Sequence, residues 1–423
     1  MNGIRISPSK ISGRAAPPPS KSVAHRAVIC AALAGGGSIS GVIRSDDMRA
    51  TLGSVEAIGV KAVVEGEKVI IEKSAIIPPE HPIIDCIESG STLRFLIPVF
   101  AALGMECTFI GRGRLPQRPL GVYAGCLPEH GVSLSNMDGL PLTISGRLQA
   151  GRYELPGDVS SQFISGLMFA LPLCDGDSDI ILTTPIESAS YIDLTIDALY
   201  NAGIIIQKVN NGWHILGGQT YRPYEYEIEG DWSQAAFLLA MGGVGGEITL
   251  DGVNLQSLQG DIIILDILRQ FGAEVQTSEH GVKCRRGDLQ GVKIDASQIP
   301  DLVPILATLG ALAEGETIIS GASRLRLKES DRLEAVSHCL KLLGGHIEQT
   351  EDGLRINGVN RLFGGVTLPS FNDHRIAMSM AVAALGCDNP IIIEDAECVA
   401  KSWPDFFNIY NKCGGVADVV RNR

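Results

Sequence analysis

A passage of about 70 residues recurs six times along the chain, and six copies fill its 423 residues. Each copy starts with a short β-like run, passes through a small polar cluster into an apolar helix, and then adds a strand, a second helix and a further strand. The β-like runs lie at 4–6, 83–85, 153–155, 226–228, 292–294 and 366–368. Such a repeat dictates the architecture, because one copy cannot bury its apolar face without its neighbours.

The two helices of a copy differ in pattern, and the difference predicts their places. The first helices are apolar on all sides, which is typical of helices inside a core: 27–33, 93–103, 163–171, 235–240, 303–312 and 376–385. The second helices are amphipathic and should cover the outside. A glycine follows each second helix, as expected of a left-handed C-terminal stop: Gly59, Gly131, Gly203, Gly272, Gly344 and Gly414. The pattern predicts an α/β (α+β) fold of two lobes with three repeats each.

Composition excludes several functional classes. A net charge of −13 and an aromatic content of 5% argue against a general nucleic-acid-binding surface. We find no export leader and no apolar run of membrane-spanning length, so neither a membrane nor a secreted location is expected. The ten cysteines are scattered without CxxC pairs, and no histidine pair has zinc-ligand spacing. The chain is therefore predicted to be cytoplasmic, with reduced thiols and no bound metal.

Polar clusters stand where the apolar helices begin. Small polar residues there are helix caps, and helix N-termini attract anions. Lys21, Ser22 and Arg26 form one such cluster, and Ser160-Ser161-Gln162 forms another. The densest cluster, at 324–332, holds four cations and two carboxylates. Ordinary caps and salt-bridged helix starts are the alternative interpretation of each cluster.

Cations recur at matched points of the repeats, and this recurrence favours a shared anion site over ordinary caps. Arg118 and Lys401 stand at positions that correspond to the 324–332 cluster. His374-Arg375 beside Asp373 adds two donors at the start of an apolar helix, which is costly unless an anion lies there. Dinucleotide loops, Walker motifs, HExxH and GxSxG are absent, so the sequence predicts chemistry without a cofactor.

Taken in order, these residues resemble the 5-enolpyruvylshikimate-3-phosphate synthases of the shikimate pathway, the family that glyphosate targets. The residues that carry the resemblance are Ser20 to Ser22, Arg26, Gly90, Arg94, Arg118, Pro119, Ser160 to Gln162, Tyr191, Gly230, Asp231, Pro300, Asp301, Lys328 to Arg332, Asp373 to Arg375 and Lys401. The match spans essentially the whole chain. It implies two lobes of three βαβαββ units, at 14–225 and at 1–13 with 226–423, and an active-site cleft between the lobes.

The resemblance implies a reaction as well as a fold. The enolpyruvyl group of phosphoenolpyruvate moves to the 5-hydroxyl of shikimate 3-phosphate, and phosphate leaves through a tetrahedral addition–elimination intermediate. This step belongs to aromatic amino acid (chorismate) biosynthesis, and the family expectation is a monomer. The two substrates bring about five or six negative charges, at roughly −1.5 to −2 per phosphate plus two carboxylates. An acidic protein would therefore concentrate cations at the site.

Roles follow from the family pattern, residue by residue. The shikimate 3-phosphate contacts implied are Lys21, Ser22, Arg26, Ser160, Ser161, Gln162, Ser188, Tyr191, Asp301 and Lys328. The phosphoenolpyruvate contacts implied are Lys21, Gly90, Arg118, Gln162, Arg332, Arg375 and Lys401. Asp301 is expected to be the base and Glu329 the acid that later reverses its role, with Lys21 or His374 as alternative proton carriers.

Two other functions remain as alternatives. The sister enolpyruvyl transferase acts on UDP-N-acetylglucosamine and uses a loop cysteine five residues before its Arg-Pro pair. Gly113 stands at that position here, and no cysteine is near. A non-catalytic anion-binding paralogue would have kept the cations and lost the carboxylates, yet Asp301 and Glu329 are both present.

Overall fold

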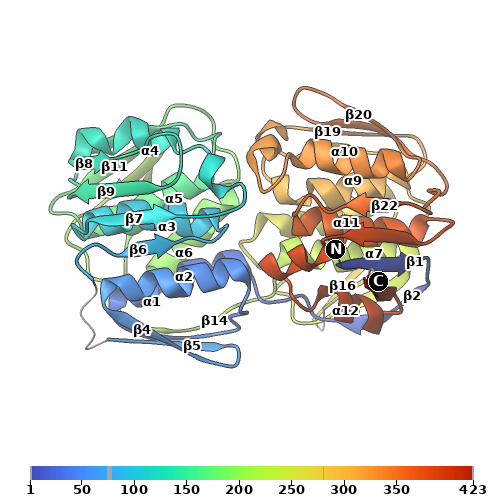
Figure 1. Cartoon of the computed structure of the whole chain (residues 1–423), viewed down its shortest axis with the longest axis horizontal. Helices are drawn as coiled ribbons and strands as arrows, with labels where there is room; N and C mark the ends of the chain where they lie inside the picture. Colours follow the sequence, from blue (N-terminus) through green and yellow to red (C-terminus); the bar gives the residue numbers. More distant parts are fainter. Residues whose placement is uncertain (1, 74–78, 280, 422–423) are drawn as a thin grey trace. The chain divides into compact units, whose positions relative to one another are not determined.

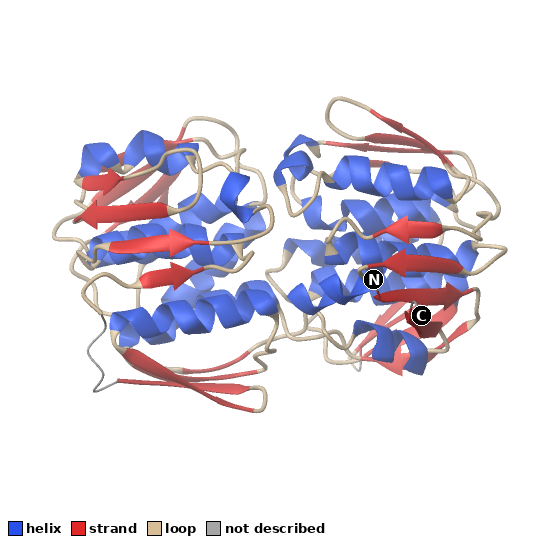
Figure 2. Ribbon diagram, viewed as in Figure 1, coloured by secondary structure: helices blue, strands red, loops and turns tan. Residues whose placement is uncertain are grey.

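Two compact units make up the computed structural model, which describes residues 2–73, 79–279 and 281–421 (Figure 1). The N-terminal unit is Pro19–Ile228, and the C-terminal unit is Met1–Pro18 together with Glu229–Arg423. Helices and strands alternate within each unit (Figure 2). The mixed α/β class predicted from the sequence is confirmed.

Every repeat builds a four-stranded sheet with one strand order. In the third repeat the order is β10 (Arg152–Leu155), β11 (Ser178–Leu182), β13 (Gly212–Ile215) and β12 (Ile206–Val209). The first two strands are parallel, so a helix connects them, and the remaining pairs are antiparallel. In the second, third, fifth and sixth repeats the buried helix is this connection, and a short loop joins it to the first strand.

The remaining strands follow the same scheme in both units. Those of the N-terminal unit are β3 (Gly36–Ser40), β4 (Val60–Glu65), β5 (Lys68–Lys73), β6 (Ile83–Asp85), β7 (Cys107–Ile110), β8 (Val132–Leu134), β9 (Leu142–Gly146) and β14 (Glu225–Glu227). Those of the C-terminal unit are β1 (Asn2–Ser7), β2 (Ile11–Ala15), β15 (Gly246–Leu250), β16 (Glu274–Ser278), β17 (Gly281–Arg285), β18 (Lys293–Asp295), β19 (Glu316–Ser320), β20 (His346–Gln349), β21 (Leu354–Asn357), β22 (Thr367–Pro369), β23 (Ile391–Glu394) and β24 (Val416–Arg421).

Two strands pair with repeats other than those that the sequence predicts. The runs at 4–6 and 226–228 were expected to open the first and fourth repeats, and this assignment is wrong. Strand β14 pairs in parallel with β3, so it completes the first repeat's sheet. Strand β2 pairs in parallel with β15 and opens the fourth repeat's sheet, while β1 lies between β23 and β24 in the sixth. Three sheets therefore contain strands from distant parts of the chain.

The helices fall into a buried and an outer set, as the patterns predict. The buried set is α1 (Lys21–Ala34), α3 (Gly90–Ala102), α5 (Ser161–Ala170), α7 (Trp232–Gly245), α9 (Val303–Ala311) and α11 (His374–Ala383). The outer set is α2 (Asp46–Val55), α4 (Gly121–Cys126), α6 (Ala189–Asn201), α8 (Ile264–Phe271), α10 (Arg332–Leu342) and α12 (Phe406–Lys412). Every residue of α7 from Trp232 to Val244 is buried, whereas α8 buries one face only.

Short 3-10 helices extend or replace turns between these elements. They are η1 (Glu56–Ile58), η2 (Leu115–Gln117), η3 (Pro128–His130), η4 (Leu171–Leu173), η5 (Gly260–Ile263), η6 (Pro300–Leu302), η7 (Ser323–Leu327), η8 (Ala384–Gly386) and η9 (Ala396–Lys401). The six predicted stop glycines all have a left-handed backbone, with φ between 81° and 95°. A side chain at these positions would be strained, which explains why glycine stands where the outer helices give way to the next strand.

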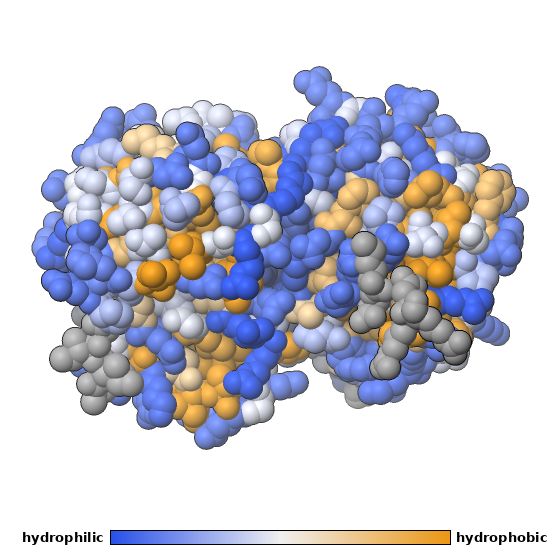
Figure 3. Space-filling view, viewed as in Figure 1, coloured by the Kyte–Doolittle hydropathy of each residue, from blue (hydrophilic) through white to orange (hydrophobic). Residues whose placement is uncertain are grey.

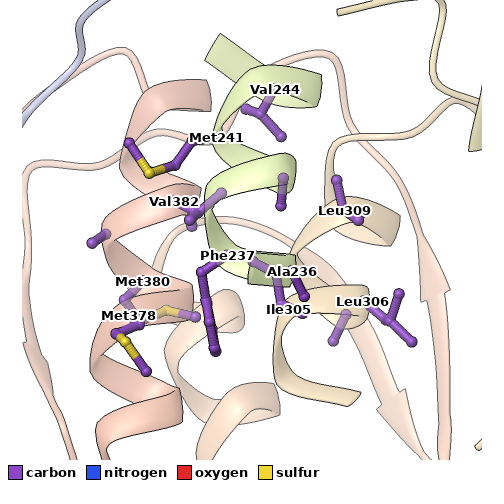
Figure 4. Close-up of a cluster of buried hydrophobic side chains, with 14 of the residues drawn as sticks. Ala236, Phe237, Met241, Val244, Ile305, Leu306, Leu309, Met378, Met380 and Val382 are labelled. Atoms are coloured by element: carbon purple, nitrogen blue, oxygen red, sulfur yellow. The ribbon is translucent and has the colours of Figure 1, made fainter. Parts of the chain in front are cut away.

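Three buried helices form the core of the C-terminal unit (Figure 4). Phe237 of α7 lies among Ile305 of α9 and Met378 and Met380 of α11, and all four side chains have no exposed surface. The N-terminal unit has its own core around α1, α3 and α5.

On the face drawn in Figure 3, hydrophilic residues predominate and apolar residues form separate patches. Within the described residues, none of the helices has the length and apolar character that a membrane crossing requires.

We expect Phe237→Ala to lower the free energy of unfolding by about 3–5 kcal/mol, because the substitution leaves a cavity between three packed helices. Denaturant titration measures the change. Phe363→Ala is the matched control, since Phe363 is 67% exposed, and a surface substitution of this kind should change stability by only about 0.5 kcal/mol. Equal losses in the two variants would contradict the placement of Phe237 in the core.

Candidate functional site

One guanidinium connects the beginnings of the three buried helices in the C-terminal unit. Arg375, in the first turn of α11, donates from Nη2 to Ser233 Oγ of α7 at 2.5 Å. The same nitrogen donates to Asp301 Oδ2 at 3.1 Å, and Nη1 donates to the Asp301 carbonyl at 3.0 Å. Asp301 lies in η6, which leads into α9. The repeat therefore places three helix N-termini, each favourable for anions, around one cation.

A second guanidinium, that of Arg332, lies among three carboxylates. It donates to Asp301 Oδ1 at 2.9 Å, to Glu329 Oε2 at 2.7 Å and to Asp373 Oδ2 at 2.8 Å. The Arg332 side chain is 2% exposed and that of Asp373 is 0% exposed. Arg332 begins α10 and Asp373 caps α11, so the pairs join these two helices to η6. The carboxylates of Asp301 and Glu329 are therefore held side by side on the guanidinium of Arg332.

We call Asp301, Lys328, Glu329, Arg332, Asp373 and Arg375 the C-terminal cluster. It contains three cations and three carboxylates, and Lys328 Nζ completes it 3.8 Å from Asp301 Oδ1. The formal charges balance, which is the condition under which burying so many ions is tolerated. Ser330 Oγ also donates to Asp373 Oδ2 at 3.0 Å.

The cations and the burial change the pKa values of the cluster. Burial alone would raise the pKa of Asp301, but Arg375, Lys328 and Arg332 outweigh it and lower that pKa far below its usual value. Burial lowers the pKa of Lys328 to about 8, although Asp301 opposes the shift. Burial would also raise the pKa of Asp373, and Arg332 reverses this effect. Asp301 is therefore an ionised carboxylate with little tendency to take a proton in this state.

Two further predicted residues adjoin the cluster. Lys401 is 8% exposed, and its Nζ donates to the Asn372 carbonyl at 2.8 Å. His374 is buried, with Nδ1 4.0 Å from Asp373 Oδ1. Phe371 and Asn372, immediately before Asp373, both have a φ of 54°. Left-handed backbone at two successive non-glycine residues is strained, and such strain is concentrated at functional sites.

Arg26 is a buried cation in the N-terminal unit. It donates from Nε to Thr195 Oγ1 at 2.8 Å, from Nη1 to the Ser22 carbonyl at 2.7 Å and from Nη2 to the Tyr191 carbonyl at 2.9 Å. Its guanidinium carbon lies 5.1 Å from the centre of the Phe95 ring. Burial lowers its pKa to about 10. Among the described residues no carboxylate pairs with Arg26, so its positive charge is not neutralised by a neighbouring side chain.

Gly90 and Arg118 are in close contact. A methyl group added at Gly90, the first residue of α3, would lie 2.6 Å from Arg118 Nη1. Arg118 is 8% exposed, and its Nε has no hydrogen-bond partner among the described residues. A buried guanidinium without a carboxylate or a full set of acceptors is costly. Arg118 therefore lies against a bare stretch of backbone with part of its hydrogen-bonding capacity unused.

An amide links the beginnings of α3 and α5. Gln162 Nε2 donates to Ser91 Oγ at 2.9 Å, and its Oε1 accepts a hydrogen bond from Arg94 Nη1 at 2.8 Å. Ser160 caps α5 and accepts from the Gln162 amide at 3.3 Å. Ser161, the first residue of α5, is 6% exposed. Serine hydroxyls and helix N–H groups at one point are suited to holding a phosphate.

The remaining predicted residues of the N-terminal unit belong to α1 and α6. Lys21 Nζ lies 2.6 Å from Asp47 Oδ2. Ser188 precedes α6 with a φ of 55°, and Tyr191 lies in the first turn of that helix. The Tyr191 ring centre is 5.9 Å from the Arg26 guanidinium. We use the name N-terminal cluster for the predicted residues Lys21, Ser22, Arg26, Gly90, Arg118 and Gln162, of which the contacts above join Arg26 to Ser22 and Gly90 to Arg118.

Sequence reasoning missed several residues that hold these side chains in place. Thr195 accepts from Arg26, and Ser165 lies 2.7 Å from Thr195 on the other side. Ser233 accepts from Arg375, and Asp47 pairs with Lys21. Thr195 and Ser165 are polar residues inside helices that also bury apolar side chains, and this contrast could have indicated that they hold a buried partner. Ser233 and Asp47 are indistinguishable in sequence from ordinary first-turn residues.

No group of three or more His, Cys, Asp or Glu side chains suited to a metal ion is found in the described part of the chain.

Comparison with known proteins gives consistent matches over the full length. A family model described as EPSP synthase (3-phosphoshikimate 1-carboxyvinyltransferase) matches residues 6–410. The 3-phosphoshikimate 1-carboxyvinyltransferase of Clostridium kluyveri is 45% identical over 421 residues, covering 99% of this chain and 99% of its own. That of Clostridioides difficile is 43% identical over 435 residues, with 99% of each chain covered.

Solved structures agree with the sequence matches. EPSP synthase from Acinetobacter baumannii aligns with a TM-score of 0.84 and 26% identity, covering 100% of both chains. The enolpyruvyl transferase NikO from Streptomyces tendae aligns with a TM-score of 0.81 over 100% of this chain and 99% of its own. At 18% identity the second likeness indicates the fold alone.

We expect Asp373→Asn to destabilise the protein by about 3–5 kcal/mol, because the substitution leaves the buried Arg332 with less compensation. Asp388→Asn provides a matched control, since Asp388 pairs with Arg361 where both side chains are about half exposed, and an exposed pair contributes only about 0–1 kcal/mol. Denaturant titration at neutral pH measures both. A loss of less than about 1 kcal/mol in Asp373→Asn would contradict a stabilising role for this pair.

Proposed function

The chain belongs to the EPSP synthase family, and from this premise we propose that residues of both clusters act in the family's reaction. The protein is an enzyme that transfers the enolpyruvyl group of phosphoenolpyruvate to shikimate 3-phosphate in aromatic amino acid biosynthesis. The observation that carries this function is the family match over residues 6–410. The clustered cations of both units support it, because each substrate carries a phosphate and a carboxylate.

The N-terminal cluster supplies most contacts to shikimate 3-phosphate in this proposal. Arg26 holds an anionic group of this substrate, since it is buried and has no carboxylate partner among the described residues. The Ser160 and Ser161 hydroxyls at the start of α5 receive its phosphate. The other contacts proposed are Lys21, Ser22, Gln162, Ser188, Tyr191, and Asp301 and Lys328 of the C-terminal cluster.

Phosphoenolpyruvate is held by cations of both clusters. Arg118 with the bare backbone of Gly90 provides one anion position, and the unsatisfied Arg118 Nε supports this role. The other contacts proposed are Lys21, Gln162, Arg332, Arg375 and Lys401. Arg332 and Arg375 already have carboxylate partners, so an arriving anion has to share them with Asp301, Glu329 and Asp373.

Asp301 is the proposed base and Glu329 the proposed acid. Asp301 takes the proton of the 5-hydroxyl as its oxygen bonds to the central carbon of phosphoenolpyruvate, and Glu329 gives a proton to the methylene carbon. Phosphate then leaves the central carbon with the proton that Asp301 had taken, and Glu329 takes a proton back from the new methyl group, which restores the double bond. Lys21 and His374 remain alternative carriers of the second proton.

The lowered pKa of Asp301 has a consequence for this mechanism. In the ligand-free state Arg375, Lys328 and Arg332 hold its negative charge, so it is a poor base. Substrate anions on the same cations weaken that stabilisation and raise the pKa of Asp301. We therefore propose that the base becomes competent only when the anionic substrates are bound, which prevents idle proton transfer.

The alternative reaction with UDP-N-acetylglucosamine is not favoured. Gly113 occupies the position of the sister enzyme's cysteine, and its φ is 59°. A Cβ atom there would lie 2.5 Å from the Glu88 carboxyl carbon. A cysteine would therefore be strained at this position.

We further propose a cytoplasmic monomer, and the ten free thiols are consistent with a reducing compartment.

One assay tests the reaction directly. Purified protein is mixed with phosphoenolpyruvate and shikimate 3-phosphate, and inorganic phosphate is measured over time. We expect phosphate release that requires both substrates. Release with UDP-N-acetylglucosamine in place of shikimate 3-phosphate, or no release with either acceptor, would contradict the function.

Glu329→Gln tests the proposed acid. We expect kcat to fall about 100-fold or more, because a positioned acid contributes roughly 10²–10⁴, while the affinity for shikimate 3-phosphate stays within about threefold. Phosphate release measures kcat, and titration calorimetry measures the affinity. Glu334→Gln makes the same change at an exposed position of α10 and should keep kcat within about twofold. Wild-type turnover in Glu329→Gln would remove Glu329 from the mechanism.

A further inference from the structure

A network of buried hydrogen bonds joins three helices of the N-terminal unit. His25 Nδ1 of α1 lies 2.7 Å from Thr51 Oγ1 of α2. Thr51 Oγ1 lies 2.7 Å from Thr92 Oγ1 of α3, which in turn donates to Ser89 Oγ at 2.7 Å. None of these four residues is more than 1% exposed. We call His25, Thr51, Thr92 and Ser89 the threonine network.

The hydrogens of the threonine network can be assigned by counting donors. Thr92 gives its hydroxyl hydrogen to Ser89, so Thr51 is the donor at the contact between the two threonines. Thr51 then has no second hydrogen to give, and the donor at its contact with His25 is the ring Nδ1–H. Every side-chain donor of the network therefore points from α1 toward the beginning of α3.

The second ring nitrogen of His25 agrees with this assignment. Nε2 is buried and lacks a hydrogen-bond partner among the described residues. A hydrogen on Nε2 would be a buried donor without an acceptor, and Nδ1 would compete with Thr92 for the single hydrogen of Thr51. Burial lowers the pKa of His25 well below its usual value, and the charges of Lys21 and Arg26 lower it further. The ring is therefore neutral, with its hydrogen on Nδ1.

The two ends of the network lie beside residues that the proposed function uses. His25 directly precedes Arg26 in α1. Ser89 is the N-cap of α3 and directly precedes Gly90, which is in contact with Arg118. The network thus connects the helix that carries one buried cation to the start of the helix that presents bare backbone to another.

We propose that Thr51 is a positioning residue for the reaction, because its hydroxyl sets the first turn of α3 and thereby the contact that Gly90 and Arg118 offer to phosphoenolpyruvate. The inference rests on the proposed function for the identity of that anion. Thr51 joins the two halves of the network, and at 0% exposed it cannot touch a ligand. Ser89 Oγ accepts from both the amide and the hydroxyl of Thr92, so the orientation of this cap depends on the threonines. Loss of the Thr51 hydroxyl should therefore weaken anion binding more than it slows the chemical steps.

Thr51→Val removes the hydroxyl and keeps the size and β-branched shape of the side chain. We expect the KM for phosphoenolpyruvate to rise about three- to tenfold, the factor that one lost buried hydrogen bond gives, with kcat nearly unchanged. Thr51→Ser restores the hydroxyl and should recover most of the wild-type KM. Ser54→Ala is the matched control, since it removes a buried hydroxyl of the same helix that donates to the Ala50 carbonyl at 2.6 Å, and its KM should match the wild type. An equal rise of KM in Ser54→Ala, or no recovery in Thr51→Ser, would overturn the proposal.

Binding without turnover separates this inference from the proposed function. Titration calorimetry with phosphoenolpyruvate alone needs no acceptor, and its affinity should fall in Thr51→Val by the factor by which the KM rises. Wild-type protein that binds phosphoenolpyruvate with this dependence and releases no phosphate would contradict the proposed function and support the inference. Phosphate release with equal affinities in Thr51→Val and the wild type would overturn the inference and leave the function in place.

Nitrogen NMR of the wild type tests the network even if Thr51→Val folds poorly. With isotope-labelled histidine, the His25 ring should be neutral with its hydrogen on Nδ1 at neutral pH, and the signal absent from His25→Gln identifies it. Thr92→Val breaks the same network, so it should raise the KM as Thr51→Val does, and the two substitutions combined should add little. A hydrogen on Nε2 in the wild type, or additive effects of the two substitutions, would overturn the proposal.

Discussion

The structure of the C-terminal unit depends on one guanidinium shared by three carboxylates. Arg332 is almost inaccessible to water, and its partners lie in η6, in the loop before α10 and at the N-cap of α11. Each charge would be costly to bury alone, and together they are tolerated because they compensate one another. The same contacts fix the beginnings of three elements. The same ion pairs therefore balance the buried charges and hold the proposed acid and base in place.

The two clusters differ in their balance of charge, and the difference supports the separate parts proposed for them. The C-terminal cluster is neutral, so it can hold reactive carboxylates close together. In the N-terminal cluster Arg26 and Arg118 lack carboxylate partners among the described residues, and the positive charge there is uncompensated. Uncompensated buried cations favour a multiply charged ligand. A protein with a net charge of −13 can bind such ligands because its surface charge and its site charge are separate.

Local sequence patterns predicted the elements of this fold and failed where distant segments pair. The apolar helices and the six glycine stops were evident because burial and left-handed backbone each restrict the residues allowed. The partner of β14 was missed, since Glu225–Glu227 is short and polar and its pattern says nothing about β3. Residues of the site were identified where several cations recur, as at 324–332. Thr195 and Ser233 were missed because a single polar residue in a helix does not reveal what it contacts.

Strand exchange affects how the protein assembles during synthesis. The sheet of the first repeat includes β14, so the N-terminal unit can be complete only after residue 227 has emerged from the ribosome. Strand β1, made first, has partners at 391–394 and 416–421. At about 5–20 residues per second, that strand spends tens of seconds without its neighbours. The charge of Arg5 and the strand's length of six residues limit nonspecific association of β1 while it lacks its neighbours.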